Sequence, residues 1–171
     1  MKAAHPGAGA FDALYLACIW TAGIAIALMS VMIPIGVFMR YVMGVGAQWP
    51  EPIAILLMML FTFIGAAAAY RAGGHIAVDM LTNVLPPAPK RLAALVVNLL
   101  MLAVCGYVAW YGTELCVGTM HQTVSELPWL PVGVTYAAIP LGALATAVFV
   151  LERLAFGSQA RRAIMRIGDA D

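Results

Sequence analysis

Four long stretches without a single charged residue divide this sequence. They cover residues 13–39, 52–70, 92–113 and 127–151 and are between 19 and 27 residues long. About 20 residues of α-helix cross the roughly 30 Å hydrocarbon core of a bilayer, and a helix satisfies its own backbone hydrogen bonds there. Strands of a β-barrel would alternate polar and apolar residues, whereas these stretches are apolar on every face. The sequence therefore predicts an all-α integral membrane protein with four transmembrane helices.

The composition excludes most other classes of protein. Hydrophobic residues make up 64% of the 171 residues and charged residues only 10%, whereas soluble domains have about 45–50% and about 25%. The high hydrophobic fraction also excludes a disordered chain. A net charge of +1 supplies no positive field for nucleic acid. We expect a single membrane domain over residues 1–171, with membrane lipid as a partner and no nucleic acid.

Prolines locate the fourth span and predict irregularities in two helices. Pro128 and Pro131 suit a first helical turn, so this span is expected to occupy residues 131–151. The first three spans are expected to occupy the uncharged stretches whole. Pro34 and Pro140 fall inside spans and are expected to kink them, because proline removes a helical hydrogen bond.

The positions of the nine Lys and Arg residues predict the orientation. With four crossings, both termini and the 71–91 loop lie on one side of the membrane. Eight basic residues collect on that side, against Arg40 alone on the other. By the positive-inside rule, both termini and this loop are cytoplasmic, and residues 40–51 and 114–126 lie outside. The eight residues are Lys2, Arg71, Lys90, Arg91, Arg153, Arg161, Arg162 and Arg166.

Two segments outside the spans could form short surface helices. In the 71–91 loop, polar residues recur at His75, Asp79 and 82–83, a helical spacing that predicts a short interfacial helix. An irregular loop that touches neighbouring helices is the alternative. The basic tail from Arg153 to Asp171 is expected to form a short surface helix or to remain a solvated tail that fixes topology.

The four uncharged stretches contain no Asp, Glu, Lys, Arg or His. Proton relays and ion-coupled pumps place such groups in the membrane, so this chain is not expected to transport ions by itself. Asn98 is the strongest polar group within a stretch. A hydrogen bond to another helix is favoured over a ligand contact for this residue.

No cofactor, metal site or catalytic residue is predicted. A four-helix cytochrome needs facing pairs of embedded histidines, but His75 and His121 fall on opposite sides of the membrane and His5 lies in the tail. The three cysteines form no CxxC pair and indicate neither a disulfide framework nor a zinc site. The chain is therefore not expected to be an enzyme.

The candidate functional residues lie mainly at the membrane boundaries. Arg40 and Glu51 flank a short outer turn and can pair to fix helix ends, with Trp49 between them as an interface anchor. Exposed pairs contribute only about 0–1 kcal/mol unless they are partly buried. His75 and Asp79 share one face at i,i+4 spacing and suit contact with a partner. The full set of candidates for interface anchoring or subunit contact is Arg40, Trp49, Glu51, His75, Asp79, Asn98 and Trp129.

Several short motifs follow one another along the chain: Phe38-Met39-Arg40-Tyr41, Trp49-Pro50-Glu51, Phe63-Ile64-Gly65-Ala66-Ala67, Gly74-His75-Ile76-Ala77-Val78-Asp79, Pro128-Trp129 and Ile139-Pro140-Leu141-Gly142. Their order, together with the four-helix layout and the length of the chain, resembles the small permease subunit of tripartite ATP-independent periplasmic (TRAP) transporters, the DctQ-like family. The resemblance covers roughly residues 11–155. It departs from the family at one point: the family often has two acidic residues after the tryptophan, whereas here Glu51 matches the first and Pro52 takes the place of the second.

This resemblance implies a non-catalytic partner of a larger membrane subunit in the bacterial inner membrane. The larger subunit would carry the substrate and sodium sites and move as an elevator. A periplasmic substrate-binding protein would deliver an organic acid, commonly a carboxylate. Two other hypotheses remain open at this point: a membrane anchor that holds haem or quinone for a redox complex, and a small exporter that works as a homodimer.

Overall fold

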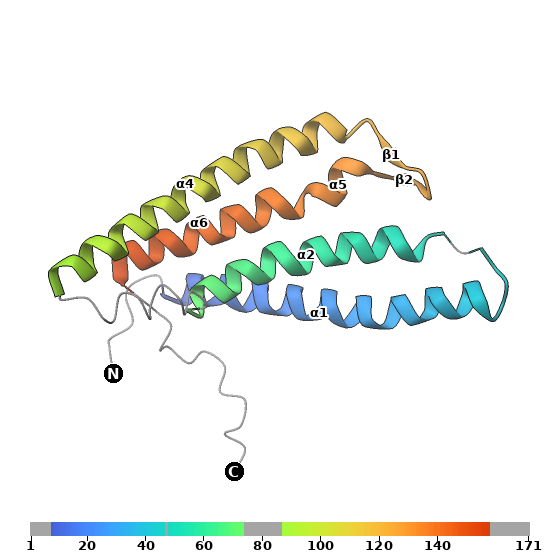
Figure 1. The fold of residues 1–171 in the computed structure, drawn as a ribbon, viewed down its shortest axis with the longest axis horizontal. Coiled ribbons are helices and arrows are strands. Elements are labelled where there is room, and N and C mark those ends of the chain that lie inside the picture. Colours follow the sequence, from blue (N-terminus) through green and yellow to red (C-terminus); the bar gives the residue numbers. More distant parts are fainter. Residues whose placement is uncertain (1–7, 47, 74–86, 158–171) are drawn as a thin grey trace, which may run out of the picture.

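A computed structural model describes residues 8–46, 48–73 and 87–157, and nearly all of this part is helical. Four long helices dominate, and the last is preceded by a short helix and a two-stranded hairpin (Figure 1). The elements are α1 (Ala8–Tyr41), α2 (Pro50–Arg71), α4 (Pro87–Thr119), β1 (Thr123–Val124), β2 (Leu127–Pro131), α5 (Val132–Tyr136) and α6 (Ala138–Phe156).

The prediction of four membrane-spanning helices is confirmed. Four helical segments in the described part are long and apolar enough to cross a bilayer, the fourth being α5 and α6 together. The helices extend beyond the predicted spans. α1 has 34 residues and α4 has 33, about 50 Å at 1.5 Å per residue, so both exceed the hydrocarbon thickness.

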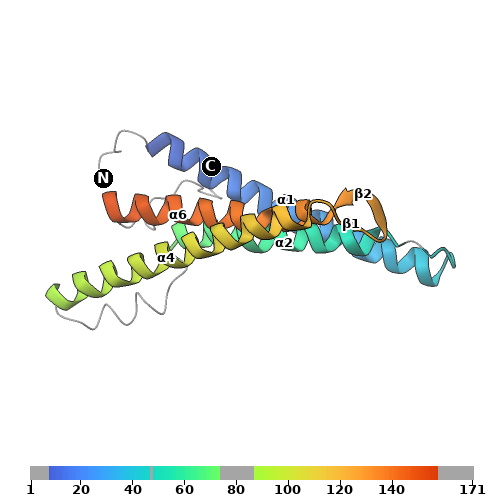
Figure 2. The same ribbon diagram turned by 90° about the horizontal axis from the view of Figure 1, so that it is seen from above.

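The helices form an open layer in the order α1, α2, α6, α4. α1 packs against α2, and both α2 and α4 pack against α6. α1 and α4 are consequently the two edges of the layer (Figure 1). We call the end where α1 and α4 begin and α2 and α6 finish the terminal end, and the opposite end the hairpin end. Figure 2 shows α4 and α1 diverging toward the terminal end.

Helix ends follow from local sequence. α2 begins with Pro50 at its first position, where the missing N–H costs no hydrogen bond, and Glu51 places a negative charge near the positive end of the helix dipole. α6 ends before Gly157, which has φ +81° and donates its N–H to the carbonyl of Arg153 at 2.9 Å. Glycine adopts this left-handed conformation without steric cost.

The entry to the fourth span differs in part from the prediction. Its helix begins at Val132, as expected, but Pro128 and Pro131 belong to β2 and not to a first helical turn. The hairpin pairs Val124 with Leu127 and Thr123 with Pro131. Both prolines suit the extended backbone of a short, two-stranded sheet.

The two prolines within helices have different effects. The fourth span divides at Ala137, three residues before Pro140, because this proline cannot donate a hydrogen bond to the carbonyl of Tyr136. The expected irregularity at Pro140 is therefore present as a break between α5 and α6. α1 continues through Pro34 as one helix.

The buried core lies toward the terminal end of the layer. Cys18 of α1, Ala67 of α2 and Phe149 and Val150 of α6 are among its members. Elsewhere most large apolar side chains are uncovered, including Trp20, which is 61% exposed. The predicted interfacial helix in the 71–91 loop and the tail beyond residue 157 lie outside the described residues.

Candidate functional site

A buried ion-pair network joins three helices near the terminal end. Arg71, the last residue of α2, donates hydrogen bonds from Nε and Nη2 to the two carboxylate oxygens of Glu152 on α6, at 2.7 and 2.8 Å. Its Nη2 also donates to Oδ1 of Asp12 on α1, at 2.6 Å. This forked arrangement matches the planar geometry of guanidinium to that of a carboxylate.

Aromatic rings enclose the guanidinium. Its central carbon lies 5.1 Å from the ring centre of Tyr15 and 5.5 Å from that of Phe149. These two rings meet edge to face with centres 6.5 Å apart. The side chain of Arg71 is 4% exposed and that of Glu152 is 1% exposed. Removing water from charged groups is costly, so the network depends on every partner being present.

The network was not anticipated from the sequence, although it does not contradict the absence of ionisable groups from the four uncharged stretches. Asp12, Arg71 and Glu152 each adjoin the end of a predicted uncharged stretch, because charges themselves set those limits. In the structure all three lie inside helices. One signal was available in the sequence: the three charges flank the same side of three spans and hence lie at a similar depth. Opposite charges at a similar depth on neighbouring helices can form an ion pair, and this follows from their positions in the sequence and not from the composition.

Beside this network, Asn98 makes the interhelical hydrogen bond expected for it. The hydroxyl of Tyr70 on α2 donates to Oδ1 of Asn98 on α4 at 3.2 Å. Asn98 is 7% exposed and Tyr70 is 5% exposed. The guanidinium of Arg153 lies 5.9 Å from the ring centre of Tyr70. This bond links α2 directly to α4, whereas both helices otherwise pack mainly against α6, which lies between them.

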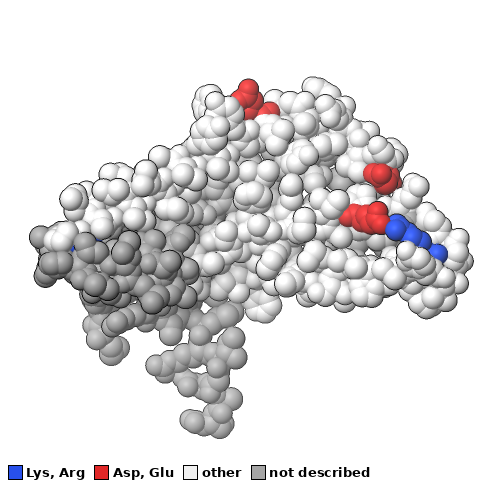
Figure 3. All heavy atoms as spheres, viewed as in Figure 1, with Lys and Arg blue, Asp and Glu red and all other residues white. Residues whose placement is uncertain are grey.

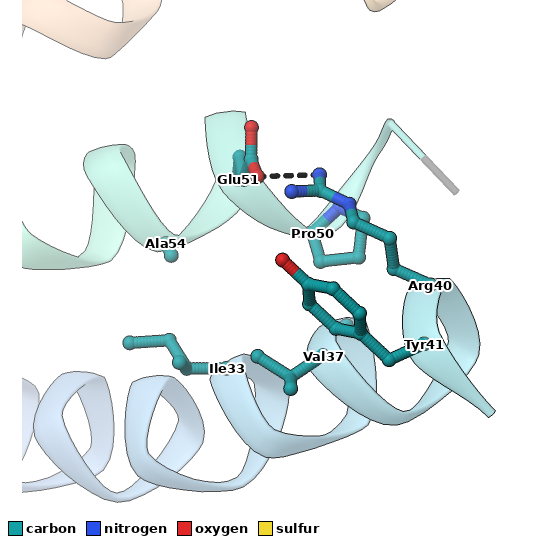
Figure 4. Close-up of a pocket in the computed structure, with 8 residues that line it drawn as sticks. Ile33, Val37, Arg40, Tyr41, Pro50, Glu51 and Ala54 are labelled. Atoms are coloured by element: carbon teal, nitrogen blue, oxygen red, sulfur yellow. Dashed lines mark hydrogen bonds and ion pairs between the residues drawn. The ribbon is translucent and has the colours of Figure 1, made fainter. Parts of the chain in front are cut away.

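At the hairpin end, Arg40 and Glu51 form the ion pair that their positions predict. Nη2 of Arg40 donates to Oε1 of Glu51 at 2.5 Å, and their side chains are 47% and 66% exposed. Figure 4 shows the pair at the mouth of a small hollow of about 110 Å³, beside Tyr41 and Pro50. A Cβ added at Gly36 would lie 3.0 Å from the Pro50 ring, so α1 and α2 approach closely here.

Glycine allows a second close approach, between α2 and α6. A Cβ added at Gly142 would lie 2.6 Å from both Cβ and the carbonyl oxygen of Phe63. Such separations are far below van der Waals contact, so only glycine fits at this crossing. Small residues are a common means of bringing transmembrane helices together.

The remaining candidates are placed as follows. Trp49 precedes α2 and is 39% exposed, and Trp129 on β2 is 72% exposed. Both lie at the hairpin end, whereas the Asn98 contact lies toward the terminal end. His75 and Asp79 fall outside the described residues. The structure thus brings Arg40 and Glu51 together and leaves the two tryptophans uncovered.

The polar groups described above join one helix to another. Both carboxylates of the buried network accept hydrogen bonds from the guanidinium of Arg71, and each of these contacts links two helices.

Comparison with protein families shows which family has this helical layer. Residues 29–159 match the family described as tripartite ATP-independent periplasmic transporters, DctQ component. The chain belongs to this family. It is therefore a TRAP transporter component and a multi-pass protein of the inner membrane.

Individual relatives agree with the family. The chain is 28% identical over 129 residues to a protein of Haemophilus influenzae provisionally named a TRAP transporter small permease, covering 75% of this chain and 80% of that protein. It is 32% identical over 117 residues to the C4-dicarboxylate TRAP transporter small permease protein of Rhodobacter capsulatus, covering 67% and 50%. An ectoine TRAP transporter small permease protein of Halomonas elongata is 24% identical over 127 residues, covering 73% and 65%.

Family membership decides between the open hypotheses. The matching family is a transporter component and not an enzyme family, so the reading as a redox anchor loses its support. Glu51 pairs with Arg40, and Pro52 follows it in the first turn of α2.

Proposed function

We propose that this small permease is the static scaffold of its transporter and holds the large permease subunit in place during transport. One observation carries the proposal: the helices form an open layer whose apolar faces are largely uncovered, while the charges of α1, α2 and α6 contact one another. The buried ion pairs hold three helices of this layer together, and the layer offers a wide apolar surface to a second membrane protein. Lipid covers what the partner does not.

The transport reaction itself is assigned to the other components. We infer sodium-coupled uptake of an organic acid that a periplasmic substrate-binding protein delivers to the two membrane subunits. The relatives are named for different solutes, a C4-dicarboxylate and ectoine. This difference supports placing substrate choice outside the small permease.

The orientation proposed for the complex has both termini in the cytoplasm. Arg71, Lys90 and Arg153 lie at the terminal end of the layer, and Arg40 lies at the hairpin end, which agrees with the positive-inside rule. The 71–91 loop, with His75 and Asp79, would then contact the large subunit or lipid on the cytoplasmic side. Trp49, Trp129 and the Arg40–Glu51 pair would anchor the periplasmic side.

Labelling of single cysteines tests this orientation in intact cells. A cysteine introduced at Ser125, between the two strands, should react with a membrane-impermeant maleimide, whereas one introduced at the exposed Ala72, which follows α2, should react only after lysis. The native cysteines Cys18, Cys105 and Cys116 would give background labelling, so they are first replaced by alanine or serine. The reverse pattern would place the termini outside.

Reconstitution tests the scaffold role. Liposomes that contain both membrane subunits, supplied with the binding protein and a sodium gradient, should accumulate the solute. Liposomes with only the small permease should accumulate none. Uptake by the small permease alone would contradict the proposal, as would purification in mild detergent without any large subunit.

A further inference from the structure

The outer edge of α4 carries a hollow that this chain leaves open. The hollow measures about 750 Å³, and Leu144 of α6 forms part of its floor. α4 is an edge helix of the layer, so its outward side has no neighbouring helix within the described residues (Figure 1). The α4 residues that line it include Gly106, Ala109, Trp110, Thr113, Glu114 and Gly118.

Two glycines in this hollow lie in open space as far as the structure describes the chain. A Cβ added at Gly106 or Gly118 would meet nothing within 4 Å, whereas one added at Gly112 would lie 3.1 Å from Ile139. Gly112 is thus needed for the packing of α4 against α6. Gly106 and Gly118 leave room on the outward side of α4 for the backbone of a neighbouring helix, and small residues let membrane helices approach closely.

A lone carboxylate lies in the same hollow. Glu114 is the one acidic residue in the sequence of α4, and Figure 3 shows an isolated acidic patch at the α4 edge in a wide uncharged surface. Among the described residues, its side chain has no ion pair or hydrogen bond. It also borders the adjoining hollow formed with Tyr111 and Leu115. Glu114 lies five residues before the end of α4, near the membrane boundary at the hairpin end, where a cation of a partner can complement its charge.

The opposite edge of the layer differs in its side chains and charges, although Gly23 of α1 also has nothing within 4 Å of an added Cβ. The outward side chains of α1 are large and apolar, such as Trp20, Ile24 and Val31, which are 61%, 53% and 60% exposed. The charges of α1 contact charges within the chain, Asp12 with Arg71 and Arg40 with Glu51. Nothing on α1 therefore requires a charged partner, and lipid chains suit its surface.

We propose that the α4 edge is the docking surface for a transmembrane helix of the large permease subunit, which places a Lys or Arg side chain against Glu114. This proposal rests on the scaffold function and names the surface through which it acts. The glycines and Ala109 let the two backbones approach, and Trp110 forms a wall of the hollow. The ion pair fixes the register of the two helices, because Glu114 is the one acidic residue in the sequence of α4.

Photo-crosslinking in the assembled transporter tests the surface. A benzophenone amino acid is placed at Ala109 or Thr113 on the α4 edge, and at Ile24 or Val31 on α1 as matched controls. The α4 positions should crosslink to the large subunit and the α1 positions should not. Crosslinks from the α1 positions alone would overturn the docking surface while leaving the scaffold function intact. Crosslinks from the α4 positions to lipid alone would overturn it as well.

Charge reversal tests the ion pair. Glu114→Lys should reduce the large subunit recovered with the tagged small permease at least five-fold, and Glu114→Gln should reduce it less. Glu126→Lys, in the exposed turn of the hairpin, serves as the control and should leave recovery unchanged. The melting temperature of the purified small permease should not change in any of the three variants, which separates lost docking from lost folding. Full recovery with Glu114→Lys would overturn the pair, whereas absence of the large subunit from the wild-type preparation would overturn the scaffold function itself.

Discussion

Arg71 and Glu152, 81 positions apart in the sequence, form a two-bond ion pair that is almost fully buried between α2 and α6. Asp12 completes the network from α1. The three helices are thus joined at the terminal end by polar contacts, to which the Tyr70–Asn98 hydrogen bond between α2 and α4 is added. Polar contacts of this kind have direction, so they fix how the helices are placed relative to one another.

Loss of the central cation should destabilise the small permease strongly. Arg71→Ala leaves two carboxylates without their shared partner, and we expect a loss of about 3–5 kcal/mol in the free energy of unfolding. The measurement is SDS- or heat-induced unfolding of the purified protein in detergent. The triple variant Asp12→Asn, Arg71→Met, Glu152→Gln should unfold closer to the wild type, because no unpaired charge remains. Equal stability of Arg71→Ala and the wild type would disprove a supporting role for the network.

The exposed pair at the hairpin end should behave differently. Arg40→Ala is expected to change the free energy of unfolding by only about 0–1 kcal/mol, since water screens both side chains. If the pair and Trp49 also contact a partner subunit, Arg40→Ala and Trp49→Ala should lower recovery of the complex before they alter substrate preference. Recovery by affinity purification and competition for uptake measure these two effects. Unchanged recovery with altered selectivity would place the substrate pocket closer to this chain than we expect.

The Tyr70–Asn98 hydrogen bond should contribute modestly. Asn98→Leu is expected to cost on the order of 1 kcal/mol, in the range of interhelical hydrogen bonds in membranes. Tyr70→Phe removes the donor while keeping the ring, so the double variant should cost little more than either single one. Unfolding of the four proteins under identical conditions completes the cycle. Strict additivity would mean that the two side chains do not interact.

The crossing of α2 and α6 should be intolerant of a single methyl group. Gly142→Ala would force its Cβ against the backbone of Phe63, and we expect a loss of about 1–3 kcal/mol. Gly23→Ala on α1 is the matched control, because nothing lies within 4 Å of an added Cβ there. Alanine forms helices better than glycine, so the control should be neutral or slightly more stable. A thermal melt of each variant distinguishes the two outcomes.

Local pattern predicted much of the fold. The four apolar stretches predicted four membrane helices because a bilayer demands length and hydrophobicity from each segment separately. The start of the last helical segment at Val132 and the irregularity near Pro140 followed from proline chemistry. The predicted helix limits were short, since charges served as boundaries although helices continue through the interface. The hairpin at β1 and β2 was missed because it is too short to carry a pattern of its own.

The sequence by itself determined the membrane class, the number of crossings, the candidate pair of Arg40 and Glu51 and the family. Each of these depends on residues close together in the chain or on the order of short motifs. Only the tertiary structure decided that Arg71 meets Glu152 and Asp12, that Gly142 meets Phe63, and that Glu114 meets no charge among the described residues. The reason is physical: in a bilayer the hydrophobic effect inserts each helix but does not choose its neighbour, so the arrangement follows from close packing and polar contacts between residues distant in the sequence.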